Sequence, residues 1–355
     1  MDSRRRLPQP LRKEVAIELV TAADRIGKLK PWTFMSDHEV IGVRDGARGE
    51  LRIASVIGEL REVLGVVFYR GPEGLRYIHT LLTEEEAPEP ARVLEGMDCL
   101  KVEWVNEREL LEPDWALLAA AEFRPVGRGR IWPQFQSWRP GWQPEFVSET
   151  EAGHLAEDLR KVARFAELVK RRPTLYEGHT RGEVPLAPGG SEDMLKAEEI
   201  EWLPLVPAPA APSEPVRLSV VEEEELAALP VREGAVFELL ARLAPDLAFV
   251  DEASGKTCIS RVVLMADQES YFVLAVEAAH GASSMHELVG RILVKGLRAA
   301  KARPCAIEVA DARLVPLCRP TCDKVGVPVR QVAELRSAND AFESMRKHFR
   351  AQRSR

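Results

Sequence analysis

The chain has 355 residues, of which 45% are hydrophobic and 30% charged, with a formal net charge of −7 at pH 7. This length suffices for two domains with cores of their own. The acidic balance argues against a protein whose whole surface coats nucleic acid or an anionic membrane, although a local basic patch is compatible with it. No apolar run approaches the ~20 residues that span a bilayer. The arginines near the start precede no apolar stretch, so we expect no secretory signal.

The five cysteines favour a reducing compartment. They are an odd number without a secretory signal, which predicts free thiols and a cytoplasmic location. Cys318 and Cys322 form the only close pair in the sequence. Without a second pair or nearby histidines, this spacing is typical of ordinary helix cysteines rather than of a zinc site, so we expect no metal here.

The first part of the chain alternates helical and strand patterns. Residues 13–28 carry apolar side chains at helical spacing and predict an amphipathic helix. Two strands, 40–44 and 51–56, flank the turn-rich loop 45–49 and favour a hairpin. The elements expected next are a strand at 65–70, a helix at 71–82, a strand at 99–105 and a helix at 107–121.

The most distinctive stretch is 124–142, RPVGRGRIWPQFQSWRPGW. It holds four arginines, four large aromatic residues, three prolines and no acid. In one interpretation it is a nucleic-acid platform, in which arginines neutralise phosphates and aromatic rings stack on bases. In the other it is a buried strap between the first core and the next helix, with its arginines paired to glutamates. We favour the strap. The binding candidates in either case are Arg128, Arg130, Trp132, Trp138 and Arg139.

A long helix and a proline-rich linker follow. Ser148 and Glu151 have the spacing of a capping box, and the apolar stripe after them predicts a helix over 149–171. A further strand is expected within 200–206. Five prolines between 204 and 215 indicate a semi-rigid linker. We therefore predict an N-terminal domain over 1–203, a linker over 204–215 and a C-terminal domain over 216–355.

The C-terminal domain is predicted to run strand, strand, strand, helix, strand, helix, strand, helix after a short acidic helix. The acidic helix is expected at 219–229. The stretch 235–243 fits either a helix or a strand, and we favour a strand because of the elements that follow. Further strands are expected at 260–265, 271–277, 304–309 and 327–331, and helices at 284–300, 314–324 and 338–350.

This order is similar to the ribonuclease H-like fold of integrase and transposase cores, and the hairpin at 264–273 and the strand at 304–311 resemble theirs. The resemblance implies acids that converge to hold two Mg²⁺ or Mn²⁺ ions for phosphodiester cleavage. The candidates here are Glu238, Asp311 and either Asp340 or Glu343. Glu238 stands where such cores usually have aspartate, and Ala312-Arg313 follows Asp311 in place of Asn-Gly. We therefore expect the fold without the chemistry.

The chain as a whole also resembles a group of uncharacterised bacterial proteins with two domains. The shared features are the Lys30-Pro31-Trp32 entry, a W-P-x-F-x-S-x-x-P-G segment at 132–141, and a D-x-E-S hairpin at 267–270. This resemblance implies membership of a group but no activity.

Together these patterns predict an α/β protein, with an α+β N-terminal domain and a ribonuclease H-like mixed-sheet C-terminal domain. We expect a cytoplasmic, non-catalytic binding or interaction protein without a cofactor, whose partner is a protein or a nucleic acid and not a membrane. The alternatives are a Mg²⁺- or Mn²⁺-dependent nuclease-like phosphodiesterase and a nucleic-acid binder without catalysis.

Overall fold

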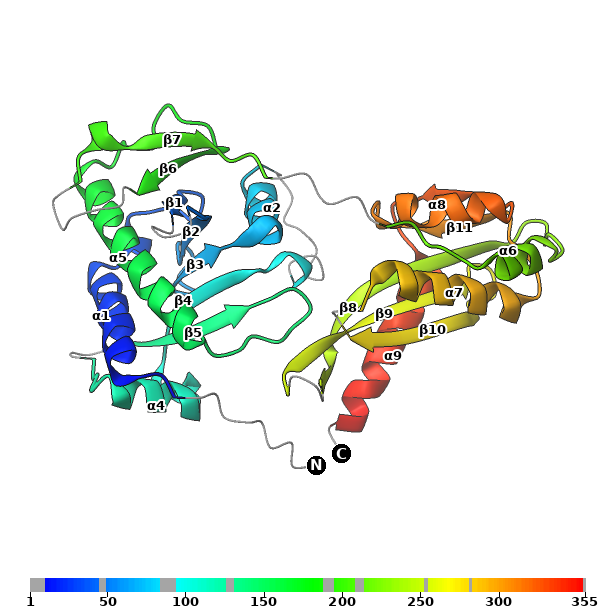
Figure 1. The fold of residues 1–355 in the computed structure, drawn as a ribbon, viewed down its shortest axis with the longest axis horizontal. Helices are drawn as coiled ribbons and strands as arrows, with labels where there is room; N and C mark the ends of the chain where they lie inside the picture. Colours follow the sequence, from blue (N-terminus) through cyan, green and yellow to red (C-terminus); the bar gives the residue numbers. More distant parts are fainter. Residues whose placement is uncertain are drawn as a thin grey trace. The chain divides into compact units, whose positions relative to one another are not determined.

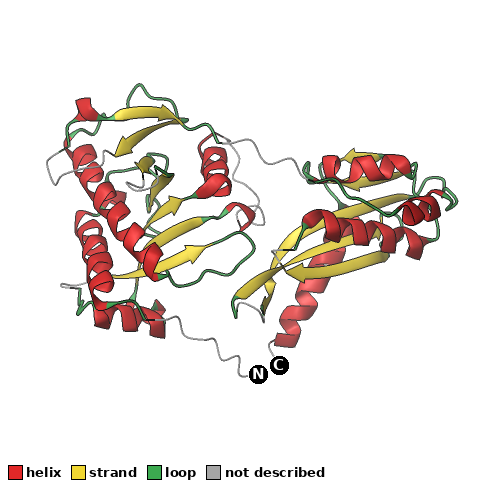
Figure 2. Cartoon of the chain, in the orientation of Figure 1, coloured by secondary structure: helices red, strands yellow, loops and turns green. Residues whose placement is uncertain are grey.

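The computed structural model of the chain is α/β, with two mixed sheets (Figures 1 and 2). It describes residues 10–44, 49–83, 94–125, 131–187, 195–207, 214–251, 255–280 and 283–353. The chain divides into two compact units. Unit 1 is Met1–Pro140 with Pro144–Pro209, and unit 2 is Gly141–Gln143 with Ala210–Arg355. The main division, between Pro209 and Ala210, falls within the stretch 204–215 that we predicted as a linker.

Unit 1 contains a seven-stranded sheet with the order β5-β4-β3-β2-β1-β6-β7. Its strands are β1 Ile41–Arg44, β2 Leu51–Ile57, β3 Gly65–Tyr69, β4 Cys99–Val105, β5 Trp132–Trp138, β6 Glu183–Ala187 and β7 Glu201–Pro204. Its helices are α1 Lys13–Leu29, α2 Gly71–Thr83, α4 Glu112–Ala120 and α5 Glu149–Arg171, with 3-10 turns at Pro31–Thr33, Glu107–Glu109 and Ala197–Glu199. All neighbouring strands are antiparallel except β1 and β6, which are parallel.

Two layers of helix enclose this sheet. The main core joins α1 and α5 to one face, where Leu19 and Ile26 of α1 and Leu155 and Leu159 of α5 are fully buried. A second core joins Ile78 and Leu82 of α2 to Ile53, Val67 and Tyr69 on the other face. Figure 1 shows α1 and α5 running together along one side of unit 1, away from α2.

Helix α5 has the bounds that its sequence predicts, because both of its signals are local. Ser148 Oγ accepts a hydrogen bond from the backbone N–H of Glu151, and the Glu151 carboxylate accepts one from the N–H of Ser148. Twelve of its 23 residues are buried. Among them is Asp158, whose Oδ1 accepts a hydrogen bond of 3.0 Å from Arg52 of β2, which is itself only 4% exposed. This ion pair crosses the interface between α5 and the sheet.

Unit 2 contains a five-stranded sheet with the order β10-β9-β8-β11-β12. Its strands are β8 Val236–Val250, β9 Thr257–Asp267, β10 Val273–His280, β11 Ala306–Val309 and β12 Val329–Gln331. Its helices are α6 Val220–Ala227, α7 Met285–Ala300, α8 Leu314–Lys324 and α9 Arg336–Arg353. β8, β9 and β10 are antiparallel neighbours, whereas β8, β11 and β12 are parallel. The predicted alternation of strands and helices in this part of the chain is confirmed.

The helices of unit 2 cover both faces of its sheet. α6, α7 and α8 pack on one face, over Phe237, Met265 and Ile307. α9 packs on the other face, where Ala338 and Phe342 contact the side of Leu240 and Leu264. Figure 1 shows α7 and α8 in front of the strands and α9 behind them. Of the helices in the described part of the chain, none is both long and apolar enough to cross a membrane.

Three expectations from the sequence need correction. The helix predicted over 107–121 is a 3-10 turn followed by α4, because Pro113 suits the first turn of a new helix. β6, Glu183–Ala187, was not predicted, since it is short and joins the sheet beside the distant β1. Within 124–142, which we predicted as a buried strap without assigning a strand, Trp132–Trp138 form β5, an edge strand of the sheet.

Candidate functional site

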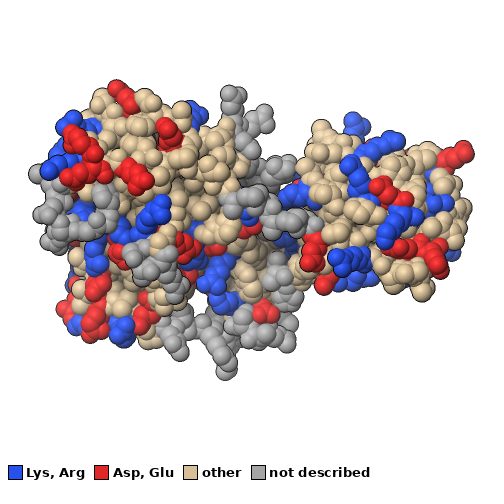
Figure 3. Space-filling view, turned by 45° about the horizontal axis from the view of Figure 1, so that its top comes forward, with Lys and Arg blue, Asp and Glu red and all other residues tan. Residues whose placement is uncertain are grey.

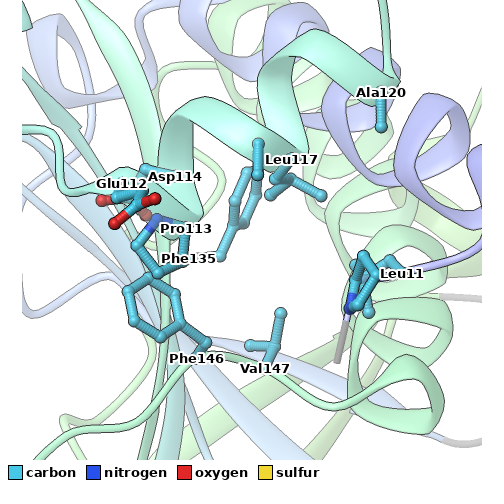
Figure 4. A pocket seen from close by; sticks show the side chains of 11 residues that line it. Leu11, Glu112, Pro113, Asp114, Leu117, Ala120, Phe135, Phe146 and Val147 are labelled. Carbon is cyan, nitrogen blue, oxygen red and sulfur yellow. The ribbon is translucent and has the colours of Figure 1, made fainter. Parts of the chain in front are cut away.

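A cavity of about 260 Å³ lies in unit 1 beside the first turns of α4 (Figure 4). Its walls come from α4, from β5 and from the segments that precede α1 and α5. The described lining residues are Pro10, Leu11, Glu112, Pro113, Asp114, Ala116, Leu117, Ala120, Phe135, Phe146 and Val147. All of these residues are apolar except two acids. Figure 4 shows Leu117, Phe146, Val147 and Leu11 around the opening, with Glu112 and Asp114 at one end.

The start of α4 fixes the polar end of this cavity. Asp114 lies in the first turn, and its Oδ2 accepts a hydrogen bond of 2.9 Å from the backbone N–H of Leu111. A helix leaves its first N–H groups without backbone partners, so an acid in this position satisfies one of them. The carboxylate of Asp114 is therefore held by the local geometry of the helix start.

A second element supports the same carboxylate from the sheet. Gln134 of β5 donates a hydrogen bond of 2.8 Å from Nε2 to Oδ2 of Asp114. Both side chains are buried, Asp114 at 2% and Gln134 at 8% exposure. Burial raises the pKa of Asp114 above its usual value, and the two hydrogen bonds offset only part of this effect. The group is thus a desolvated acid beside an apolar cavity.

The polar end offers hydrogen-bond acceptors. Glu112 is exposed, and in the described part of the chain Oδ1 of Asp114 accepts no hydrogen bond. The described lining residues carry two carboxylates and no cation. An ionised carboxylate accepts hydrogen bonds and attracts positive charge. The arrangement can hold an apolar group and, at one end, a hydrogen-bond donor.

Two aromatic residues of the predicted nucleic-acid platform, Trp132 and Trp138, are not exposed in the structure. Trp132 is 6% exposed, and its ring meets that of Trp115 edge-on at 5.1 Å between centroids. Trp138 is half-buried and donates from Nε1 to the side chain of Gln136 at 3.0 Å. A base cannot stack on a ring as buried as that of Trp132. Arg128 and Arg130 lie outside the described residues.

Arg139, the remaining candidate of this stretch, lies beside a polar network at the start of α5. Its guanidinium is half-exposed and lies 3.4 Å from the carboxylate of Glu151. The same carboxylate accepts hydrogen bonds from Arg70 at 2.9 Å and from Ser137 at 2.8 Å. Burial by itself would raise the pKa of Glu151, but hydrogen bonds from Ser148, Ser137 and Arg70 outweigh it and lower the pKa to about 2. This network joins α5 to the sheet.

In unit 2, Glu238 is fully buried and its carboxylate accepts hydrogen bonds from the start of α9. Its two carboxylate oxygens accept hydrogen bonds from the backbone N–H groups of Arg336, at 3.2 Å, and Ala338, at 2.8 Å. The side-chain amide of Gln268 donates to Glu238 at 3.3 Å and to Glu308 of β11 at 3.1 Å. The carboxylate of Glu238 therefore occupies the positive end of a helix, which stabilises it.

The other three acids that we considered as metal ligands have different surroundings. Asp311 forms a bidentate ion pair with Arg313, two residues away, in which Nε donates to Oδ1 and Nη2 to Oδ2. Glu343 is 49% exposed and pairs with Arg346 at 2.8 Å. Asp340 lies on α9. In the described ranges there is no group of three or more histidine, cysteine or acidic side chains placed to hold a metal ion.

Two family models match the chain. Residues 17–186 match a domain of unknown function (DUF7309), and residues 223–346 match a second domain of unknown function (DUF6930). This is a two-domain protein. The first match contains every described lining residue of the cavity except Pro10 and Leu11, and the second contains Glu238, Asp311, Asp340 and Glu343. Comparisons with curated proteins and with solved structures returned no match.

The sequence did not reveal the cavity. Its lining residues come from four separate segments and follow no motif, so only their tertiary arrangement brings them together. One local signal was available. Asp114 follows Glu112 and Pro113, and a proline with acids in these positions is typical of the first turn of a helix. Gln134 and Glu308 were also missed, because neither carries a pattern that distinguishes it from other polar strand residues.

Proposed function

We propose that the chain is a non-catalytic binding protein and that the cavity beside α4 receives a small apolar ligand. The cavity itself carries this proposal. An apolar cavity of about 150 Å³ can hold benzene, so one of about 260 Å³ has room for a somewhat larger molecule. Ligand sites are typically concave and mostly apolar, with a few polar groups that set orientation. In this cavity, Glu112 and Asp114 are the polar groups that would set the orientation of a ligand.

Rigid elements support a preformed site. Phe135 is 1% exposed within β5, and Val147 is 6% exposed immediately before α5. Both belong to the main core of unit 1, so their side chains have little freedom to collapse into the space. A ligand would gain roughly 25 cal/mol for each Å² of apolar surface removed from water. This gain favours binding without a large rearrangement.

For unit 2 we propose a ribonuclease H-like fold without metal chemistry. The sheet order β10-β9-β8-β11-β12, with the first three strands antiparallel and the last three parallel, supports the fold. Two of the candidate metal ligands already have partners in the protein, which supports the absence of metal chemistry. Glu238 accepts hydrogen bonds from α9, and Asp311 is paired with Arg313. A protein that works by binding needs no converging acids.

We also propose a cytoplasmic location. The five cysteines are all free, and Cys99, Cys258, Cys318 and Cys322 are buried. Burial raises the pKa of Cys99 and of Cys322 to about 12, so these thiols stay protonated and unreactive at neutral pH. Unpaired cysteines are usual in reducing compartments.

The binding proposal is tested by titrating the full chain with toluene and following methyl resonances by NMR. We expect saturable shifts of the Leu117 and Val147 methyl groups. The variant Ala116→Phe places a ring in the cavity and should abolish these shifts. The matched control is Ala119→Phe, at a likewise exposed residue of the same helix that does not line the cavity, which should leave them unchanged. Shifts that do not saturate, or that persist in Ala116→Phe, would refute the proposal.

A further inference from the structure

The charge of the cavity is one-sided. Glu112 and Asp114 are the only charged groups among the described lining residues, and both lie in the first turn of α4. The opposite walls are made by Leu11, Val147 and Ala120, which carry no polar side-chain atoms (Figure 4). A ligand that fills the cavity must therefore place its polar end against two carboxylates and its apolar end against aliphatic side chains.

The buried carboxylate cannot turn away from a ligand. Oδ2 of Asp114 is fixed by the N–H of Leu111 and by Gln134, at 2.9 and 2.8 Å. This places the remaining oxygen, Oδ1, which has no hydrogen-bond donor in the described residues, as the acceptor left for a ligand. Oδ1 is not among the fully buried unsatisfied atoms of the described residues, so it is open to a ligand or to water. A positively charged donor satisfies this oxygen and offsets part of the cost of desolvating the carboxylate.

A neutral or an anionic head group would fit less well. A hydroxyl supplies one donor and no charge, and a carboxylate supplies a like charge that the two acids repel. A protonated amine supplies three donors and a positive charge. Figure 4 also shows the ring of Phe146 on the same side of the cavity as the acids, where an aromatic face can attract a cation.

We infer that the cavity beside α4 is a site for a small primary amine, with its ammonium group at Glu112 and Asp114 and its hydrocarbon part among Leu117, Phe135 and Val147. This inference rests on the proposed function and adds the chemical class of the ligand. The volume of about 260 Å³ suits a chain of roughly six to eight carbons, by comparison with the about 150 Å³ that holds benzene.

The test uses three probes of one length: hexylamine, 1-hexanol and hexanoate. Each is titrated into the full chain at pH 7 by calorimetry, with NMR to locate the bound probe. We expect hexylamine to bind at least about tenfold more tightly than 1-hexanol, and hexanoate to bind most weakly. Binding of hexylamine should compete with toluene and be lost in Ala116→Phe.

Two variants test whether the acids Glu112 and Asp114 bind the ammonium group. Glu112→Gln removes an exposed charge and should weaken hexylamine about tenfold while leaving 1-hexanol unchanged. Asp114→Asn should do the same, and its amide oxygen can still accept the hydrogen bond from Leu111, so the helix start is kept. Glu107→Gln, an exposed acid outside the cavity, is the matched control and should have no effect.

The outcomes separate this inference from the proposed function. If 1-hexanol binds as tightly as hexylamine and Glu112→Gln changes neither, the amine assignment is wrong and the apolar site stands. If none of the three probes binds, and toluene does not bind either, both are wrong. A preference for hexylamine that Glu107→Gln removes but Glu112→Gln does not would place the amine elsewhere and overturn the inference.

Discussion

The side-chain amide of Gln134 donates a hydrogen bond of 2.8 Å to Oδ2 of Asp114, and this bond joins the edge strand β5 to the first turn of α4. Both residues are buried, so breaking the bond would leave polar groups away from bulk water. It positions the one buried acid of the cavity.

Gln134→Ala should therefore change both the pKa of Asp114 and the stability of unit 1. Asp114 would lose one of its two hydrogen bonds, so the pKa of its carboxyl should rise further above the usual value. Unit 1 should lose about 1–2 kcal/mol of unfolding free energy. The pKa is measured by the ¹³C NMR titration of the carboxyl. Glu107→Gln, at an exposed acid outside the cavity, is the control. An unchanged pKa in Gln134→Ala would contradict the role of this bond.

The network at Glu151 predicts sensitivity to acid. The pKa of Glu151 is about 2 in the folded chain and near 4.5 when unfolded, so its carboxylate stabilises the fold above pH 4.5 and this contribution is lost as the pH falls toward 2. The shift corresponds to about 3 kcal/mol at neutral pH. Its side chain is 13% exposed, so solvent screening is small.

Glu151→Gln should thus lower the unfolding free energy of unit 1 by about 3 kcal/mol at pH 7 and by much less near pH 3. Tryptophan fluorescence during denaturation follows unit 1, which holds six of the seven tryptophans. Glu149→Gln, in the same first turn but 41% exposed, should change stability by less than about 1 kcal/mol. A difference between Glu151→Gln and the parent that does not depend on pH would refute this account.

The buried pair of Arg52 and Asp158 predicts a non-additive pair of substitutions. Their side chains are 4% and 0% exposed, and the guanidinium donates to Oδ1 of the carboxylate at 3.0 Å. Removing one partner leaves a charge buried and unpaired, so Arg52→Met or Asp158→Leu alone should cost about 3–5 kcal/mol. The double variant should recover most of that loss, because two apolar side chains replace two charges. Equal and additive losses would show that the pair is not coupled.

The hydrogen bonds of Glu238 predict that its substitution loosens the start of α9. Its carboxylate accepts the N–H groups of Arg336 and Ala338 from across the sheet. Glu238→Gln removes the charge and one acceptor, so hydrogen exchange of these two amides should become faster by about tenfold or more. Exchange is followed by mass spectrometry or NMR. Glu343→Gln, on the exposed side of α9, is the control. A Mg²⁺-dependent change in exchange at Glu238 in the parent would favour the nuclease-like alternative instead.

Much of the secondary structure could be predicted, and little of the candidate site. The strands and helices from Val236 to α9 follow the predicted order because each carries its own hydrophobic period. The short strand β6 was missed, since five residues carry too little pattern. Of the cavity, only the helix of α4 was foreseen. Trp132 was a binding candidate by composition, but composition does not report that its ring packs against Trp115.

The sequence by itself determined those features whose signals lie within one or two turns of chain. α5 is the clearest case, because the Ser148–Glu151 capping box and the apolar stripe after it are local. Only the tertiary structure decided which faces meet. It placed Phe135, Leu117 and Leu11 around one cavity, although they are far apart in sequence, and it brought Glu238 to the N–H of Ala338, 100 residues away. Such contacts depend on strand order and helix packing, which a linear pattern does not specify.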